Sequence, residues 1–154
     1  MHIYVDADAC PKVIKNILYK TANRLKIDVT LVANRFLHVP PSQFIKSIQV
    51  EYGMDVADEK IVELVRPGDL VITADVPLAN NTIEKGGVAI NPRGEFYTKE
   101  NIRNLLSIRN VMTELRDNGL KTEGPKTFSP KDQNAFANQL DRFMTQHQAG
   151  KTLS

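Results

Sequence analysis

The sequence has few of the residues that cross-link a chain, bind zinc or anchor a protein in a membrane. Its single cysteine cannot form an internal disulfide, and its three histidines form no HxxxH motif. A CxxC motif is also absent, which excludes the common cysteine- and histidine-rich metal sites. No apolar run approaches the about 20 residues that cross a membrane, and no secretory leader precedes the first predicted strand. These absences predict a cytoplasmic protein with no membrane partner.

The net charge of +2 is too small to indicate nucleic-acid or membrane binding by itself. The charge is unevenly distributed, however. Residues 1–84 carry 9 basic and 11 acidic side chains, whereas residues 85–154 carry 11 and 7. This asymmetry suits a cation site in the first part and a phosphate-facing surface in the second.

Strand and helix patterns alternate through most of the chain. Apolar runs typical of strands occur at residues 3–5, 29–33, 48–52, 70–73 and 88–90. Helical patterns lie between them, over residues 13–25, from residue 42, from residue 58 and over residues 77–85. This alternation predicts an α/β fold of three layers, with a mostly parallel sheet of about five strands and helices on both faces.

The alternation stops after residue 94. Phe96-Tyr97 is predicted as a small edge strand, and a helix is predicted over residues 99–117. Ser129-Pro130-Lys131-Asp132 has an N-cap residue, a proline at the first helical position and an acid at the third, which predicts the start of a last helix. We therefore expect a single domain over residues 1–148, with its helical part packed on the sheet, and a frayed tail at 149–154.

Acidic residues follow two of the predicted strands. Asp6 and Asp8 follow the first strand with a spacing that aims both side chains to one side, and Asp75 follows the fourth. Asp58 begins the helix that leads into the fourth strand. The carboxyl ends of parallel strands lie at one edge of the sheet, so these acids converge if the first and fourth strands are neighbours. Each Asp taken singly is better explained as a helix cap or a turn residue than as a catalytic group, and only the set as a whole favours a metal site.

Carboxylates crowded in this way repel one another, and a divalent cation removes that repulsion. Oxygen ligands suit Mg²⁺ or Mn²⁺, which can activate water and stabilise the leaving oxygen of a phosphodiester. We therefore predict a metal site formed by Asp6, Asp8, Asp58 and Asp75, with Asp6, Asp8 and Asp75 as catalytic residues.

Arginines in the second part of the chain are candidates for binding substrate phosphate. Arg93-Gly94 follow the fifth strand, at the same predicted edge as the acids. Arg109 lies on the apolar face of its predicted helix, and Arg116 follows it by seven residues. A guanidinium in such a place needs a partner, which is either a phosphate or a structural carboxylate.

Several segments closely resemble the YaiI/YqxD family of uncharacterised bacterial proteins, namely IYVDADACPK, LVAN, DVADEKIV, GDLVITADVPLA, EKGGVAINPRGE and FSPKDQNAF. That family is similar in turn to the PIN-like nuclease superfamily, whose members hold divalent metals with acids at strand ends and cleave RNA. The resemblance implies a PIN-like fold. It places the acids of the PIN pattern on Asp6, Asp8, Asp58 and Asp75.

Two departures from these patterns concern the site. Many PIN nucleases have a Glu in an interior helix, for which Glu51 and Glu63 are the candidates here. The family loop usually reads Gly-Gly-Pro, where this chain has Glu123-Gly124-Pro125. Gly124 is the remaining candidate for contact with an anion.

The leading functional hypothesis is a metal-dependent nuclease or phosphodiesterase that acts on RNA or a nucleotide-like ligand. One alternative is a phosphatase that resembles the haloacid-dehalogenase class, with Asp6 as nucleophile, Asp8 as general acid and base, and Thr73 and Lys85 in later motifs. The other is a binding module for nucleotides or RNA that has no catalytic activity.

Overall fold

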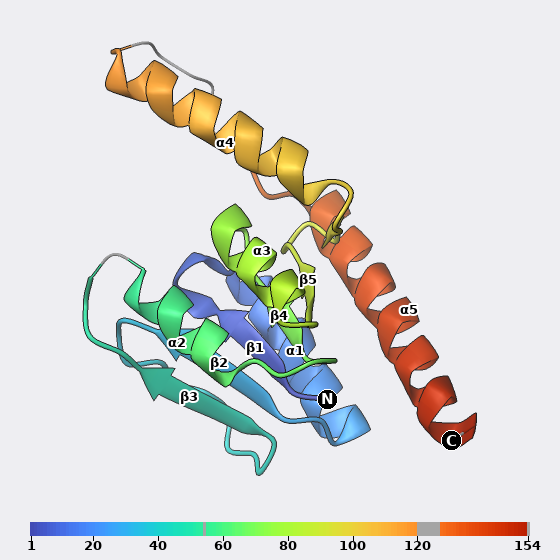
Figure 1. The fold of residues 1–154 in the computed structure, drawn as a ribbon. Coiled ribbons are helices and arrows are strands. Elements are labelled where there is room, and N and C mark those ends of the chain that lie inside the picture. The colour runs from blue at the N-terminus through green and yellow to red at the C-terminus, as the bar shows by residue number, and fades with distance from the viewer. Residues whose placement is uncertain (54, 120–126, 154) are drawn as a thin grey trace.

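A six-stranded sheet forms the centre of the computed structural model, which describes residues 1–53, 55–119 and 127–153 (Figure 1). The strands lie in the order β3-β2-β1-β4-β5-β6, and all of them are parallel except β6, which pairs with β5 in the antiparallel sense. Their bounds are β1 Ile3–Asp6, β2 Val29–Ala33, β3 Ile45–Gln49, β4 Leu70–Ile72, β5 Val88–Ile90 and β6 Phe96–Tyr97. The predicted fold class and the edge strand are confirmed.

Helices cover both faces of the sheet, as the alternation of elements predicts. A 3-10 turn, η1 (Ala7–Ala9), follows β1 directly. The helices are α1 Lys12–Leu25, α2 Val56–Leu64, α3 Val76–Glu84, α4 Ile102–Asp117 and α5 Pro130–Leu153. Because α5 runs to Leu153, it covers most of the segment that we expect to fray, and that fraying stays a prediction.

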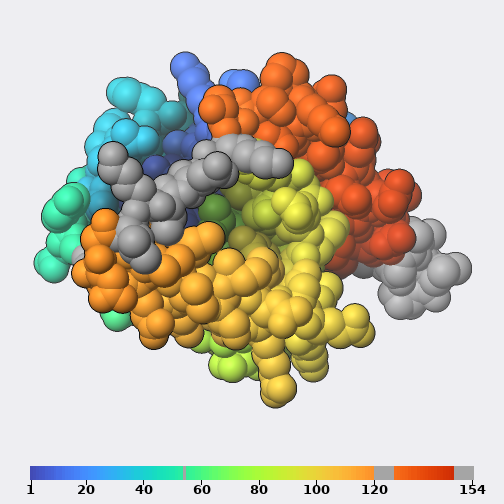
Figure 2. All heavy atoms as spheres, turned by 90° about the horizontal axis from the view of Figure 1, so that it is seen from above, coloured from blue at the N-terminus to red at the C-terminus, as the bar shows by residue number. Residues whose placement is uncertain are grey.

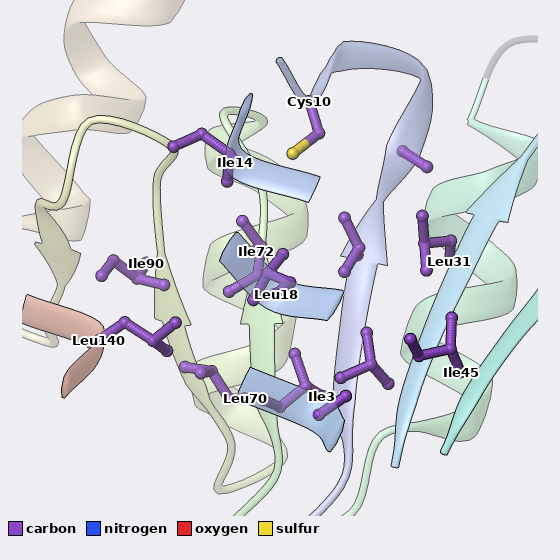
Figure 3. Packing of buried hydrophobic residues seen from close by; sticks show 14 of the residues in the cluster. Ile3, Cys10, Ile14, Leu18, Leu31, Ile45, Leu70, Ile72, Ile90 and Leu140 are labelled. Carbon is purple, nitrogen blue, oxygen red and sulfur yellow. The ribbon is translucent and has the colours of Figure 1, made fainter. Parts of the chain in front are cut away.

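The side-chain alternation of β1 decides which helices meet which residues. Ile3 and Val5 face the cluster formed with α1 and α5, where Ile14 and Leu18 pack on the sheet (Figure 3). Tyr4 faces the opposite cluster, formed with α2 and α3. Asp6 is two residues after Tyr4, so its side chain points to the same face of the sheet, toward α2 and α3.

The third strand lies three residues earlier than predicted, and the predicted short helix at Ser42 is wrong. Ser42 Oγ accepts a hydrogen bond from Phe44 N–H at 3.1 Å, which forms a local turn. Pairing with β2 then sets the register, with Ile45 beside Val29, and buries Ile45. Tyr52, placed in the strand by its alternating pattern, is instead 89% exposed beyond the strand's end.

The C-terminal part follows the prediction closely. Ser129 caps α5, since Asp132 Oδ2 accepts from its backbone N–H at 3.0 Å and Asp132 N–H donates to its Oγ at 3.3 Å. Phe136, Leu140 and Met144 of α5 are buried. The first turns of α4 pack against α3, and its later turns extend past the sheet (Figure 1). None of the described helices combines the length and hydrophobicity that crossing a membrane takes.

The order of the strands reverses between β1 and β4. From β1 the chain proceeds outward to β2 and β3, and β4 then returns to the other side of β1. In open α/β sheets the crevice outside the carboxyl ends of two such strands is the usual ligand site. The first and fourth strands are neighbours, which is the condition for the acids to converge, and their pairing brings Asp6 and Asp75 to this crevice.

Candidate functional site

Asp6 is the last residue of β1, and its side chain is almost buried. Its exposed fraction is 9%, and its Oδ2 accepts a hydrogen bond from the hydroxyl of Thr73 at 2.9 Å. Burial raises the pKa of Asp6, and the nearby charges of Asp75 and Asp8 raise it further, against the opposing effect of the Thr73 hydrogen bond. The sheet therefore holds this carboxylate in a place where negative charge is unfavourable.

Asp75 lies at the carboxyl end of β4, as the N-cap of α3. Its Oδ1 accepts from Leu78 N–H at 2.9 Å, which accounts for its place in the fold by capping alone. Its backbone N–H donates to Thr73 Oγ1, also at 2.9 Å. One buried hydroxyl thus connects Asp6 and Asp75.

Asp58 reaches the same place from the first turn of α2. Asp58 and Asp75 line the same pocket, and Asp58 is close enough to Asp75 and Asp6 for their charges to act on it. Burial, followed by the charges of Asp75, Asp6 and Asp55, raises its pKa to about 7. Three of the four predicted acids therefore converge from a strand end and two helix starts.

A pocket of about 600 Å³ opens between α2, α3 and α4. It is lined by Asp55, Asp58, Glu59, Val62, Glu63, Asp75, Pro77, Leu78, Asn81 and Arg109. We call it the acid pocket. Arg109 is the only cation among the described residues that line it. Figure 2 looks down on this end of the molecule, with α4 on one side and the first turns of α5 on the other.

Asp8 does not lie beside Asp6 in the way that the strand pattern predicts. The strand ends at Asp6 and η1 begins at the next residue, so strand alternation no longer applies at Asp8. Asp8 Oδ2 accepts from Asn34 N–H at 2.8 Å, and its Oδ1 lies 3.8 Å from Arg35 Nε. It is close enough to raise the pKa of Asp6, but it faces the segment that follows β2.

Three other predicted substrate-binding residues, Arg93, Gly94 and Arg116, do not line the acid pocket. Arg93 forms an ion pair with Asp132 of α5 at 2.9 Å. Gly94, with φ +86°, contacts the backbone of α5, where an added Cβ would lie 2.7 Å from Ala135 C. Arg116 is exposed near the far end of α4. Gly124 lies outside the described residues.

Two residues at the site carry little signal in the sequence. Thr73 stands two residues before Asp75, at a strand end, and the sequence singled it out only as a later-motif residue of the phosphatase alternative. The hydroxyl of Tyr97 donates to Thr73 O at 3.2 Å, and burial, then Asp75, raises the pKa of Tyr97 to about 12. Of the two candidates for an interior Glu, Glu63 lines the acid pocket and Glu51 does not.

The donor atoms at this edge are carboxylate oxygens, which suit a hard divalent cation. Over residues 1–53, 55–119 and 127–153, no group of three or more His, Cys, Asp or Glu side chains is arranged to hold a metal ion by itself. Mg²⁺ commonly binds through one or two carboxylates and keeps several waters. The residues therefore fit a hydrated cation held by two carboxylates, and they do not fit an all-protein cage.

Among solved structures, the fold is similar to part of a homospermidine synthase from Legionella pneumophila in complex with NAD. The two are 16% identical, with a TM-score of 0.47, over 82% of this chain and 35% of that one.

Sequence relatives are much closer. A UPF0178 protein of Janthinobacterium sp. (strain Marseille) is 58% identical over 97% of this chain and 99% of its own. A UPF0178 protein of Herminiimonas arsenicoxydans is 59% identical over 94% of this chain and 97% of its own. The family model described as "Uncharacterized BCR, YaiI/YqxD family" matches residues 4–146. Because the match spans nearly the whole chain, this protein belongs to the YaiI/YqxD family.

Proposed function

We propose that this protein is a divalent-metal-dependent phosphodiesterase that acts on RNA or a nucleotide-like substrate. The observation that carries the proposal is the convergence of Asp6, Asp58 and Asp75 at the reversal of strand order. Single carboxylates are common at helix starts, where they cap backbone N–H groups. Capping does not explain why a nearly buried strand-end carboxylate lies close to two others.

The roles of the residues follow from their contacts. Asp6 and Asp75 would hold the cation, and Thr73 fixes both through its hydroxyl group. Asp58 lies beside them. Arg109 lines the acid pocket with Asp58 and Asp75, and its guanidinium can bind a phosphate oxygen there. When bound, the cation would supply charge neutralisation and Lewis acidity at the phosphate.

The phosphatase alternative is weaker because one of its residues lies elsewhere. Lys85 follows the last residue of α3, so the whole helix separates it from Asp75 at the first turn. Its Nζ donates to the backbone carbonyl of Val62. A lysine there cannot contact a phosphate bound at Asp6.

The test compares the wild type with the double variant Asp6→Asn, Asp75→Asn. Asparagine can still accept from Thr73 and cap α3, so the fold should be kept while both charges are removed. We expect Mn²⁺ to bind the wild type in calorimetry, and single-stranded RNA to be cleaved only when Mn²⁺ is present. The variant should lose at least about 100-fold of the cleavage rate.

The matched control is Asp28→Asn, Asp117→Asn, which removes the same charge from two exposed positions. It should bind metal and cleave RNA like the wild type. Equal Mn²⁺ binding by the site variant and the wild type would contradict the metal site. Metal binding by the wild type with no turnover of any phosphodiester would favour the binding module.

A further inference from the structure

A second pocket, of about 560 Å³, lies between α1 and the segment that follows β2. Its cationic side chains are Lys12, Lys15 and Arg35, with Asn16, Tyr19 and His38 beside them. None of the described residues that line it is acidic. We call it the basic pocket, and no function described so far uses it.

The cations of the basic pocket have few partners within the protein. Lys12 and Lys15 form no ion pair in the described part of the chain. The one ion pair of Arg35 there is long, with Nε 3.8 Å from Asp8 Oδ1. Like charges held together in a concave surface raise the local potential and attract an anion. The N-cap position of α1 is Pro11, and no side chain there accepts a hydrogen bond from the first turn of the helix. This helix start adds partial positive charge to the wall of the basic pocket.

An exposed aromatic side chain lies next to the pocket. Phe36 is 69% exposed, and its ring meets the ring of His38 edge to face at 5.1 Å. Because most of its surface is exposed, this ring is accessible to a ligand in the pocket. Proteins that bind single strands combine cations along the backbone with exposed aromatic rings on which bases stack.

The position of the basic pocket relates it to the acid pocket. It lies beyond the carboxyl ends of β1 and β2 on the α1 side, whereas the acid pocket lies beside the end of β4 on the α2 and α3 side. Asp8 and Arg35 stand on the side of the edge that faces the basic pocket. The two pockets share no lining residue, and each is large enough to hold a ligand group. A nucleic acid that occupied both would place different phosphates in the two pockets.

We propose that the basic pocket binds a backbone phosphate of a single-stranded nucleic acid, with the neighbouring base stacked on Phe36. The identity of this ligand rests on the function proposed above, because a phosphodiester at the acid pocket continues into further phosphates. The basic pocket then selects an extended strand over a mononucleotide.

The experiment measures binding of a short fluorescein-labelled oligouridylate by anisotropy, in EDTA and over a series of salt concentrations. Lys12→Gln, Lys15→Gln should bind about five- to tenfold more weakly at low salt. The slope of log K against log salt should fall by about 0.7 for each phosphate that the variant no longer neutralises. Phe36→Ala should weaken binding at least about fivefold and leave the slope unchanged.

The matched controls remove the same charge, or one aromatic ring, at exposed positions outside the basic pocket. Lys20→Gln, Lys99→Gln removes two exposed lysines outside the pocket, and Tyr52→Ala removes a ring that is 89% exposed. Both should bind like the wild type. Controls that weaken binding as much as the pocket variants do would overturn the proposal, and so would a wild type that does not bind. Competition by inorganic phosphate as effective, per phosphate, as that by unlabelled oligouridylate would assign the pocket to a small anion instead.

EDTA removes divalent cations, so the binding experiment tests the basic pocket independently of the proposed metal site. Asp6→Asn, Asp75→Asn should bind the oligouridylate at least as tightly as the wild type, because it removes negative charge and leaves the basic pocket intact. If strand binding holds and no cleavage occurs with Mn²⁺, the phosphodiesterase proposal fails and the basic pocket stands. If Mn²⁺-dependent cleavage occurs and the pocket variants bind normally, the basic pocket fails alone.

Discussion

At the residue scale, Thr73 organises the site although it carries no charge. It is 1% exposed, donates to Asp6 Oδ2 and accepts from Asp75 N–H. A buried hydroxyl with two such partners fixes the side chain of one acid and the backbone of the other. The closeness of Asp6 and Asp75 therefore depends on an uncharged residue that the metal-site prediction did not include.

Replacement of Thr73 should show this dependence. Thr73→Val keeps the shape and removes the hydroxyl. The nearly buried Asp6 carboxylate and the partly buried Asp75 N–H then lose this partner, which should lower the free energy of unfolding by about 2 kcal/mol. Thr73→Ser keeps the hydroxyl and is the control, with a smaller loss that comes from the missing methyl group. Urea unfolding measures both, and equal losses would show that the hydrogen bonds contribute little.

At the element scale, the site is a meeting of two helix starts. Asp58 lies in the first turn of α2 and Asp75 is the N-cap of α3, so the positive ends of both helices point to the same place. These partial charges favour carboxylates there, but they do not outweigh burial and repulsion. The raised pKa of Asp58 is the result.

That shift predicts a pH-dependent stability. The pKa of Asp58 is about 7 in the folded protein, against an ordinary value of 3.8. The stabilisation from its neutral form is present below about pH 4 and is lost as the pH rises through 7. Asp58→Asn cannot ionise, so it should melt at a higher temperature than the wild type at about pH 8, by about 2 to 4 °C for each kcal/mol relieved.

Near pH 4 the melting temperatures of Asp58→Asn and the wild type should agree. For the control Asp28→Asn, the difference in melting temperature from the wild type should be the same at pH 8 as at pH 4. Thermal melts in EDTA at the two pH values measure these differences. A gain for Asp58→Asn that does not depend on pH would mean that its carboxyl group is already ionised at acidic pH.

At the scale of the whole molecule, one glycine joins the C-terminal helix to the sheet. Gly94, after β5, has φ +86° and lies against the α5 backbone, and Arg93 beside it pairs with Asp132 of α5. These two contacts fix the start of α5 over the edge of the sheet. The pair Arg93-Gly94 therefore has a structural explanation in the described chain.

The role of Gly94 can be separated from its backbone conformation. Gly94→Ala should lower the free energy of unfolding by about 3 kcal/mol, because it combines an unfavourable φ with a Cβ 2.7 Å from the α5 backbone. Gly68→Ala is the matched control, since Gly68 has φ +89° and open space around its Cβ position. It should lose only the about 1–2 kcal/mol of the left-handed conformation. Similar losses in urea unfolding would contradict the proposed packing role of Gly94.

Most elements of the fold could be predicted because their information is local. The apolar runs of β1, β2, β4 and β5 and the cap of α5 are complete within a few residues. The third strand could not be placed in this way because its position depends on pairing with β2. The alternating run 48–52 has the right pattern but extends beyond the residues that pair, whereas Ile45 meets Val29.

At the site, strand and helix signals are local, so the residue pattern was enough to name Asp6, Asp58 and Asp75 as carboxylates at a strand end or a helix start. Which of these carboxylates meet was settled by the fold. In the fold, η1 directs Asp8 away from Asp6, and Arg93 forms an ion pair with Asp132. Arg109 of α4 lines the acid pocket. The physical reason is that convergence depends on strand order and helix packing, which are set by contacts between residues far apart in the chain.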